Sequence, residues 1–175
     1  MKEMGYTITE VNKKNKDDFK ELAECMRTIQ WHNERGIFAG NVTFMGHQGY
    51  DIPKLKEYIE FIKNIVNIPS AKLFFAKEDC CGEKVVGVAF GGFTEEAEES
   101  KTRCGRIMFF WVNPDFRKTK LPLTLYKKLF GWFKKNNCPN VSVTFNPFQN
   151  DMSRFFVKNG YRVANVELVG PVEVM

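Results

Sequence analysis

The sequence predicts an α/β protein whose central sheet is mixed but mostly antiparallel, with helices on both faces. Two stretches in residues 19–66 place apolar side chains at helical spacing, and two apolar runs around residues 73–93 flank a polar turn. A third observation is a strand–helix–strand unit in residues 107–145. Hairpins give antiparallel pairs and a helical crossover gives a parallel pair, so the predicted order is β-α-α-β-β-β-α-β-α-β.

Length and composition favour one globular domain covering residues 1–175. Hydrophobic residues make up 43% of the chain and charged residues 27%, which is ordinary for a globular protein with a real core. The net charge of +5 suits an anionic ligand, either a phosphate-bearing small molecule or a nucleic acid, without choosing between them.

Neither a targeting signal nor a membrane span is predicted. The opening MKEMGYTITE has no apolar core of the kind a signal peptide needs, and no apolar run approaches the roughly 20 residues of a membrane helix. The five cysteines are odd in number and lack metal-ligand spacing. We therefore expect a cytoplasmic protein with free thiols and no metal site.

The first third of the chain reads as a strand and two helices. Residues Tyr6 to Val11 alternate apolar and polar, as a half-buried strand does. A helix start near Asn15–Asp17 precedes apolar residues at spacings of three and four, and Asp51 with Pro53 begins a second helix after a glycine-rich loop at 36–50. The expected apolar faces are Phe19, Leu22, Met26 and Ile29, then Leu55, Tyr58, Ile59, Ile62 and Val66.

The middle of the chain reads as three strands. The runs Leu73–Ala76 and Val85–Phe93 should form a hairpin, and Gly91–Gly92 suggests a bulge or a close backbone approach. Polar and acidic residues at 94–105 predict a solvated loop. The continuous apolar run Ile107–Val112 is typical of a strand buried on both faces.

The remaining elements alternate between helix and strand. A helix with an apolar face should end at Asn136–Asn137, and a strand should run over Val141–Phe145. Asp151 should cap a short helix that closes at Gly160, and Tyr161–Val169 should be the last strand. The expected apolar face of the longer helix is Leu121, Leu125, Leu129, Trp132 and Phe133.

The stretch around residues 106–135 predicts an anion site. The strand ending at Val112 leads into the basic loop Arg117–Lys120, and a helix begins near Leu121–Pro122. The first N–H groups of a helix lack partners and the helix dipole favours negative charge there. We interpret this loop as the seat of a phosphate-bearing ligand.

The element order, with VNPDFRKTKLPLTLYKKL within it, resembles the GNAT acetyltransferase superfamily from about Tyr6 to Val169. In that family a strand ending in Val-x-Pro is followed by an aromatic residue, an Arg or Gln, and then a helix. Val112-Asn113-Pro114 matches the strand end, and Phe116 with Arg117 matches the aromatic and basic positions. The family's later helix ends in Gly followed by an aromatic, as Gly160-Tyr161 does here.

The resemblance implies an N-acetyltransferase that moves an acetyl group from acetyl-CoA to an amine by direct attack. The thioester carbonyl is expected near Trp111–Val112, and the pyrophosphate on residues 117–123. His47, in the loop where the family's acceptor sits, is the candidate base, with His32 as an alternative. The residues expected at the cofactor are Trp111, Val112, Arg117, Lys118, Thr119, Lys120, Leu121, Leu123 and Asn150.

Three residues depart from the family's pattern. Lys120 stands where the family has a Gly and Pro122 where it has a Gly or Ala, small residues that let the backbone approach a pyrophosphate. Phe156 stands where the family often has a Tyr acid. A member that keeps the fold but only binds CoA or regulates is therefore an alternative, and a nucleic-acid-binding protein is a third. The acceptor, an amine-bearing small molecule or protein, is left open, as is a homodimer.

Overall fold

The computed structural model of the chain describes residues 5–12, 18–28, 55–79, 84–95, 103–143 and 150–163. The expected glycine-rich loop, both expected helix starts near residues 15 and 51, and most of the expected last strand lie outside these ranges. The chain divides into two compact units, Met1–Arg27 with Pro53–Val143, and Thr28–Ile52 with Thr144–Met175. The prediction of a single domain stays a prediction.

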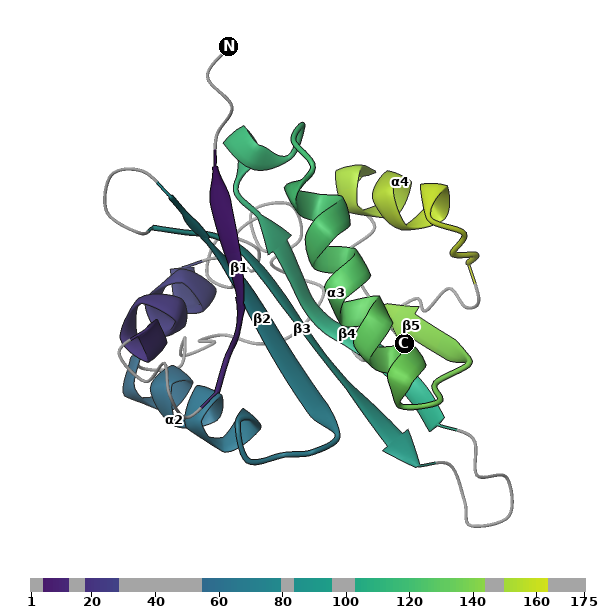
Figure 1. Cartoon of the computed structure of the whole chain (residues 1–175), viewed down its shortest axis with the longest axis horizontal. Coiled ribbons are helices and arrows are strands. Elements are labelled where there is room, and N and C mark those ends of the chain that lie inside the picture. The colour runs from purple at the N-terminus through teal and green to yellow at the C-terminus, as the bar shows by residue number, and fades with distance from the viewer. Residues whose placement is uncertain are drawn as a thin grey trace, which may run out of the picture. The chain divides into compact units, whose positions relative to one another are not determined.

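The sheet of the first unit has five strands in the order β1-β2-β3-β4-β5 (Figure 1). The first three pairings are antiparallel and the β4–β5 pairing is parallel, which confirms the predicted mixed, mostly antiparallel sheet. The strands are β1 (Tyr6–Glu10), β2 (Ala71–Glu78), β3 (Val85–Glu95), β4 (Arg103–Val112) and β5 (Asn140–Val143).

The prediction of a loop over residues 94–105 is wrong at both ends of that range. Strand β3 continues to Glu95 and β4 begins at Arg103, where Glu95 pairs with Arg103 and Thr94 with Cys104. Polar residues can extend an antiparallel strand pair where one face of the sheet is exposed to solvent, and the end of β3 and the start of β4 contain such residues. Residues 161–163 were also expected to begin a strand, and they are not in one.

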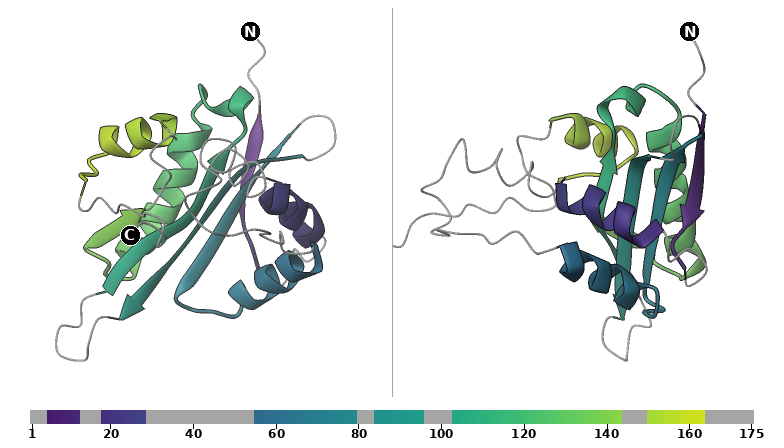
Figure 2. Two further views of the ribbon diagram at one scale, coloured as in Figure 1. Left: turned by 180° about the vertical axis from the view of Figure 1, so that it is seen from behind. Right: turned by 90° about the vertical axis from the view of Figure 1, so that its left-hand side faces the viewer.

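One face of the sheet is covered by two helices (Figure 2), one over residues 18–28 and α2 (Leu55–Ile65). Their apolar stripes pack on β2 and β3, as the spacing predicts. Full burial of one such side chain stabilises the fold by roughly 1.5–3 kcal/mol. The buried set includes Phe19, Leu22, Met26, Tyr58, Ile62, Ile65, Leu73, Phe75, Val88 and Phe90.

Polar contacts fix the helix at residues 18–28 on the sheet. The Lys77 ammonium lies 2.8 Å from Asp18 and 3.0 Å from Glu21, and the other oxygen of Glu21 accepts the Val85 N–H at 2.9 Å. Burial works to lower the pKa of Lys77, but the hydrogen bonds to Asp18 and Glu21 outweigh it and the net shift is upward. Lys77 therefore stays charged and paired.

The other face is covered by α3 (Leu121–Lys135), which crosses the sheet in front of β3 and β4 (Figure 1). Leu121, Leu125, Leu129 and Phe133 recur every four residues and have no exposed surface. The predicted apolar face is confirmed, with Trp132 at its partly exposed margin. The helix ends at the expected asparagines, where Asn137 adopts a positive φ of 56°.

Glycines let α3 approach the sheet closely. A Cβ at Gly87 would lie 2.6 Å from Leu125 Cδ1, and one at Gly105 would lie 2.9 Å from Phe133 Cδ1. At Gly91 a Cβ would meet Phe133 Cζ at 2.7 Å and the Arg106 carbonyl oxygen at 2.9 Å. The close approach expected at Gly91–Gly92 is confirmed, and its cause is the Phe133 ring.

A β-bulge lies in β4 opposite Phe90 and Gly91. Phe90 pairs with Phe109 and Gly91 pairs with Ile107, so Met108 is the extra residue on β4. Met108 is 53% exposed, so the prediction that both faces of this strand are buried is wrong at Met108. The pairing of Phe109 with Phe90 and the approach of Met108 Cε to Gly92 place Met108 and Phe109 on the α2 side.

In the second unit, α4 (Asn150–Lys158) is followed by Gly160 with a φ of 92°. Gly160 ends the helix as expected, because a positive φ is accessible to glycine at little cost. Asp151 lies within the first turn rather than before it, so the expected cap position is one residue or more too late. A carboxylate in the first turn still suits the helix dipole.

Substitution of Gly91 by Ala should destabilise the protein by about 1–3 kcal/mol, because the added methyl group overpacks against Phe133 and a backbone oxygen. The matched control is Gly131→Ala in α3, where nothing lies within 4 Å of the added Cβ. That change should instead stabilise by about 0.5–1 kcal/mol. Urea unfolding of both variants measures the difference, and equal shifts for the two would contradict close packing at Gly91.

Candidate functional site

The end of β4 is held by a short turn. The Asn113 N–H donates to the Val86 carbonyl at 2.9 Å, and Asn113 Oδ1 accepts the Asp115 N–H at 3.0 Å. This interaction caps the 3₁₀ helix η1 (Pro114–Phe116), whose Phe116 is buried. The turn therefore anchors the adjoining basic loop to the sheet core.

Thr119 organises the basic loop between η1 and α3. Its hydroxyl donates to the Phe116 carbonyl at 2.7 Å and accepts the Leu121 N–H at 3.1 Å. Arg117 folds back, with Nε donating to the Val112 carbonyl at 3.1 Å. Thr119 thus fixes the loop at its helix end, and Arg117 fixes it at its strand end.

Three backbone donors remain available between the loop and the first turn of α3. Within the described residues, the N–H groups of Lys118, Lys120 and Leu123 have no hydrogen-bond partner. Pro122 has no N–H, and Lys120 makes no side-chain cap. Three available donors within six residues of the chain are the feature that an oxyanion or phosphate recognises.

The charges at this end of α3 are positive. Lys118 and Lys120 are exposed, and no acidic residue lies in the first turn. Cationic residues at the opposite end, Lys134 and Lys135, complement the carbonyl end of the helix dipole. An anion at the N-terminus would gain from both the dipole and the lysine side chains.

Strand β4 extends well beyond its pairing with β5. The parallel pairing runs from Cys104–Asn140 to Ile107–Val143, whereas β4 continues to Val112. Trp111 and Val112 lie in this extension and pair with Val88 and Gly87 on the β3 side. Within the described residues, β4 therefore offers a strand segment on the β5 side to which no strand is paired.

A cavity of about 460 Å³ lies on the α2 face of the sheet, beside the first half of β4. The last turns of α2 contribute Phe61 and Ile65 to one wall. Its sheet side is formed by residues of β2, β3, β4 and β5, among them Thr94, Arg106, Met108 and Ser142. Arg106 pairs with both Gly92 and Ser142, so these three share one face.

The structure places most of the predicted cofactor residues on one continuous segment. Trp111 and Val112 end the strand, the loop carries Arg117 to Lys120, and α3 begins with Leu121. Asn150 is the first residue of α4 in the other unit. His47 and His32 lie outside the described residues. The cavity around Arg106 was not predicted, since it depends on a bulge and on strand register that no local pattern reveals.

Two further residues in the described part of the chain, Cys25 and Phe156, are unsuited to a catalytic role. Burial raises the pKa of the Cys25 thiol to about 12, with Glu21 adding to the effect, so Cys25 is not a thiolate nucleophile at neutral pH. Phe156 is buried and packs edge-on against Phe155 and Tyr161, as a core residue does. No cluster of His, Cys, Asp or Glu there could hold a metal, and no described helix could cross a membrane.

The chain belongs to the acetyltransferase (GNAT) family, whose profile matches residues 23–161. The match covers the sheet from β2 onward, the basic loop, α3 and α4, so it confirms the resemblance seen in the sequence. No curated protein matches the sequence significantly.

Solved structures share the fold over nearly the whole chain. A transcriptional regulator from Bacillus halodurans C-125 is 19% identical with a TM-score of 0.64, covering 94% of this chain and 97% of that one. The aminoglycoside N-acetyltransferase AAC(6')-Iy, in complex with a CoA-containing bisubstrate analogue, is 11% identical, with a TM-score of 0.64 and coverages of 94% and 95%. Glucosamine-6-phosphate N-acetyltransferase from Arabidopsis thaliana is 15% identical, with a TM-score of 0.63 and coverages of 97% and 99%.

Replacement of Thr119 by Val should destabilise the protein by about 0.5–2 kcal/mol, because Leu121 loses its hydrogen-bond acceptor at the helix start. Thr119→Ser keeps the hydroxyl and should lose much less stability. Chemical unfolding compares the two variants. If Val and Ser had the same effect, the hydroxyl would not be the group that holds the loop.

Proposed function

We propose that the protein is an acetyl-CoA-dependent N-acetyltransferase acting on a primary amine. The observation that carries the proposal is the set of available N–H groups at Lys118, Lys120 and Leu123, beside a strand segment that β5 leaves uncovered. Phosphate oxygens need donors of this kind, and an extended amide-bearing chain can hydrogen-bond to a strand edge. Acetyl-CoA contains both groups in one molecule.

The loop would hold the pyrophosphate, and the strand would hold the arm that ends in the thioester. Lys118 and Lys120 would add charge-assisted contacts to the phosphates. Trp111 and Val112 lie on the strand segment along which the thioester would run, and a backbone N–H there would donate to the carbonyl oxygen as negative charge develops on it. Arg117 would keep the end of β4 in place through its bond to Val112.

The reaction would proceed by direct attack. The amine nitrogen forms a bond to the thioester carbonyl carbon, the carbon–sulfur bond breaks, and the sulfur leaves as the thiolate of CoA. A base takes one proton from the nitrogen, and the thiolate gains one proton. His47 is our candidate for the base. Since Phe156 has no proton to give, water is the donor that we propose for the thiolate.

Several finer features of this proposal remain predictions. Asn150 would contact the cofactor from α4, and the acceptor would be a small molecule or a protein amine. A cytoplasmic location and a homodimer are also predictions that rest on the sequence. Among the described residues, Cys25, Cys104 and Cys138 form no disulfide.

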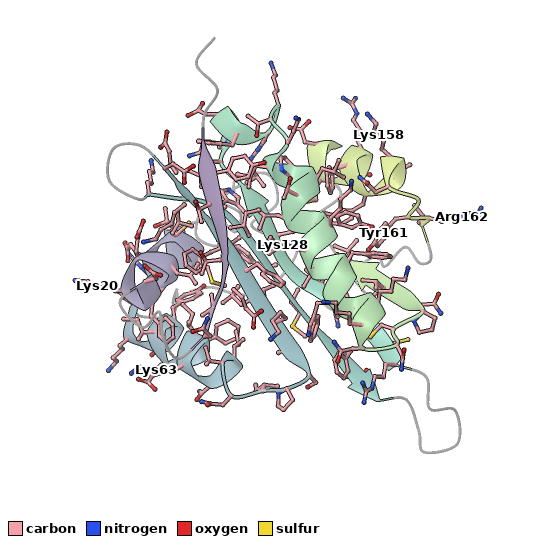
Figure 3. All side chains as sticks on the ribbon, in the orientation of Figure 1. Lys20, Lys63, Lys128, Lys158, Tyr161 and Arg162 are labelled. Atoms are coloured by element: carbon pink, nitrogen blue, oxygen red, sulfur yellow. The ribbon has the colours of Figure 1, made fainter. Side chains whose placement is uncertain are left out.

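Removal of both loop lysines, Lys118→Ala with Lys120→Ala, should weaken CoA binding about tenfold or more, because exposed charge-assisted contacts to phosphate are lost. Isothermal calorimetry with CoA and acetyl-CoA measures the change. The matched control is Lys127→Ala with Lys128→Ala, which removes the same charge from two exposed residues further along α3. Lys128 is labelled in Figure 3.

The control should change the affinity only slightly, because its lysines lie beyond the first turn. Equal weakening by both pairs would show that net charge alone matters, and the loop would not be the phosphate site. Absence of heat with the native protein at millimolar CoA would refute the proposed function altogether.

Substitution of Pro122 by Ala should tighten CoA binding by about tenfold, because it restores the N–H that the family's Gly or Ala provides at this position. Pro122 is buried in the first turn of α3, so urea unfolding should accompany calorimetry to show that the fold persists. Unchanged affinity in a folded variant would mean that the phosphates do not reach the second residue of α3.

A binding or regulatory role without catalysis is favoured by Lys120, Pro122 and Phe156 together. It predicts that CoA binds while no amine causes thiol release from acetyl-CoA. A thiol-release assay with a panel of amines separates the two functions, since turnover with any acceptor supports the transferase.

A further inference from the structure

The cavity beside β4 has an apolar body. Phe61, Ile68 and Met108 line it and are 40%, 45% and 53% exposed, so large hydrophobic side chains face solvent together at one place. Its volume of about 460 Å³ is within the range of small-molecule sites, roughly 300–1,000 Å³. Exposed apolar surface gathered in a cavity of this size indicates a ligand with an apolar portion.

The cavity also has a cationic end. Among the lining residues that the structure describes, Arg106 is the one side chain that is ionised at neutral pH. Thr94 and Ser142 add hydroxyl groups near it, on β3 and β5. An arginine guanidinium is suited to a carboxylate or a phosphate, which it can bind with two parallel hydrogen bonds. It would repel an acceptor that carries several positive charges.

The position of Arg106 along β4 sets the length of the ligand. Arg106 and Met108 lie on the α2 side of the strand, upstream of Trp111, where we place the thioester. Five residues of extended strand span on the order of 15 Å, and the Arg106 side chain bridges only part of that length. The anionic group and the reacting amine must therefore be far apart in the ligand.

We infer that the acceptor is an elongated primary amine, with an apolar chain separating the amine from a terminal carboxylate or phosphate that Arg106 binds. This inference rests on the proposed acetyltransferase function, because that function fixes where the amine must react. The apolar chain would lie against Phe61, Ile68 and Met108, and the amine would extend toward Trp111.

Binding of a product analogue tests the cavity without any need for turnover. The probe is N-acetyl-ω-aminooctanoate, and its terminal carboxamide is the matched neutral probe. Calorimetry should show that the carboxylate binds at least about tenfold more tightly, and that Arg106→Gln removes this advantage. Lys63→Gln is the control, because Lys63 pairs with Glu60 on the exposed side of α2 and does not line the cavity (Figure 3).

Turnover tests the length and charge of the acceptor. With acetyl-CoA, thiol release should be faster for ω-aminooctanoate than for octylamine or for the shorter ω-aminobutanoate. Arg106→Gln should lower kcat/KM for ω-aminooctanoate about tenfold and leave octylamine within about twofold. Arg106 is exposed, so this substitution should leave the fold intact.

The two proposals fail in different ways. Equal binding of the charged and neutral probes, or an advantage that survives Arg106→Gln, would overturn the inference even if CoA binds normally. Failure of CoA to bind would overturn the transferase function, and the product-analogue titration would then report on the cavity alone.

Discussion

The packing of α3 against the sheet is the contact on which the site depends. Gly87, Gly91 and Gly105 leave no room for a side chain between the sheet and Leu125 or Phe133. A helix held at that distance has its N-terminus fixed relative to the end of β4. Thr119 and Asn113 then need to order only a few residues between them. The position of the backbone donors is thus a consequence of core packing more than of the loop's own sequence.

Strand β4 links the two halves of the site. Its last residues carry the segment proposed for the thioester arm, and its first residues carry Arg106 on the cavity side. The bulge at Met108 lies between them and brings Met108 and Phe109 to the same face. The bulge thereby widens the apolar surface of the cavity just after the β4–β5 pairing ends at Ile107.

The helices and strands were predictable because each has a periodic pattern of apolar residues that can be recognised in a single sequence. The stripe Leu121, Leu125, Leu129 and Phe133 indicated α3, and two apolar runs around a polar turn indicated the hairpin of β2 and β3. The start of β4 was missed because Arg103 and Cys104 fall within the polar stretch 94–105, which indicates a loop. Only their pairing with Glu95 and Thr94 makes them part of a strand. Register is set by contacts distant in the chain, so the cavity at Arg106 could not be found locally.

The position of the anion site was predictable, but its donors were not. A strand end, a basic loop and a helix start can be recognised from composition, whereas the availability of an N–H depends on every hydrogen bond around it. Leu121 lies in the first turn of α3, yet its N–H already donates to the Thr119 hydroxyl. The N–H groups of Lys120 and Leu123 remain available.

The structure gives a physical reason for Lys120 and Pro122 at the positions where the family has Gly and Gly or Ala. Pro122 is the second residue of the helix, where proline is well tolerated, and it is buried in the first turn. It therefore removes one donor while it makes the helix start more rigid. Lys120 keeps its own N–H and adds an exposed ammonium beside it. The loop exchanges a backbone contact for a side-chain charge, so phosphate affinity here should depend on ionic strength more steeply than in a loop built from glycines.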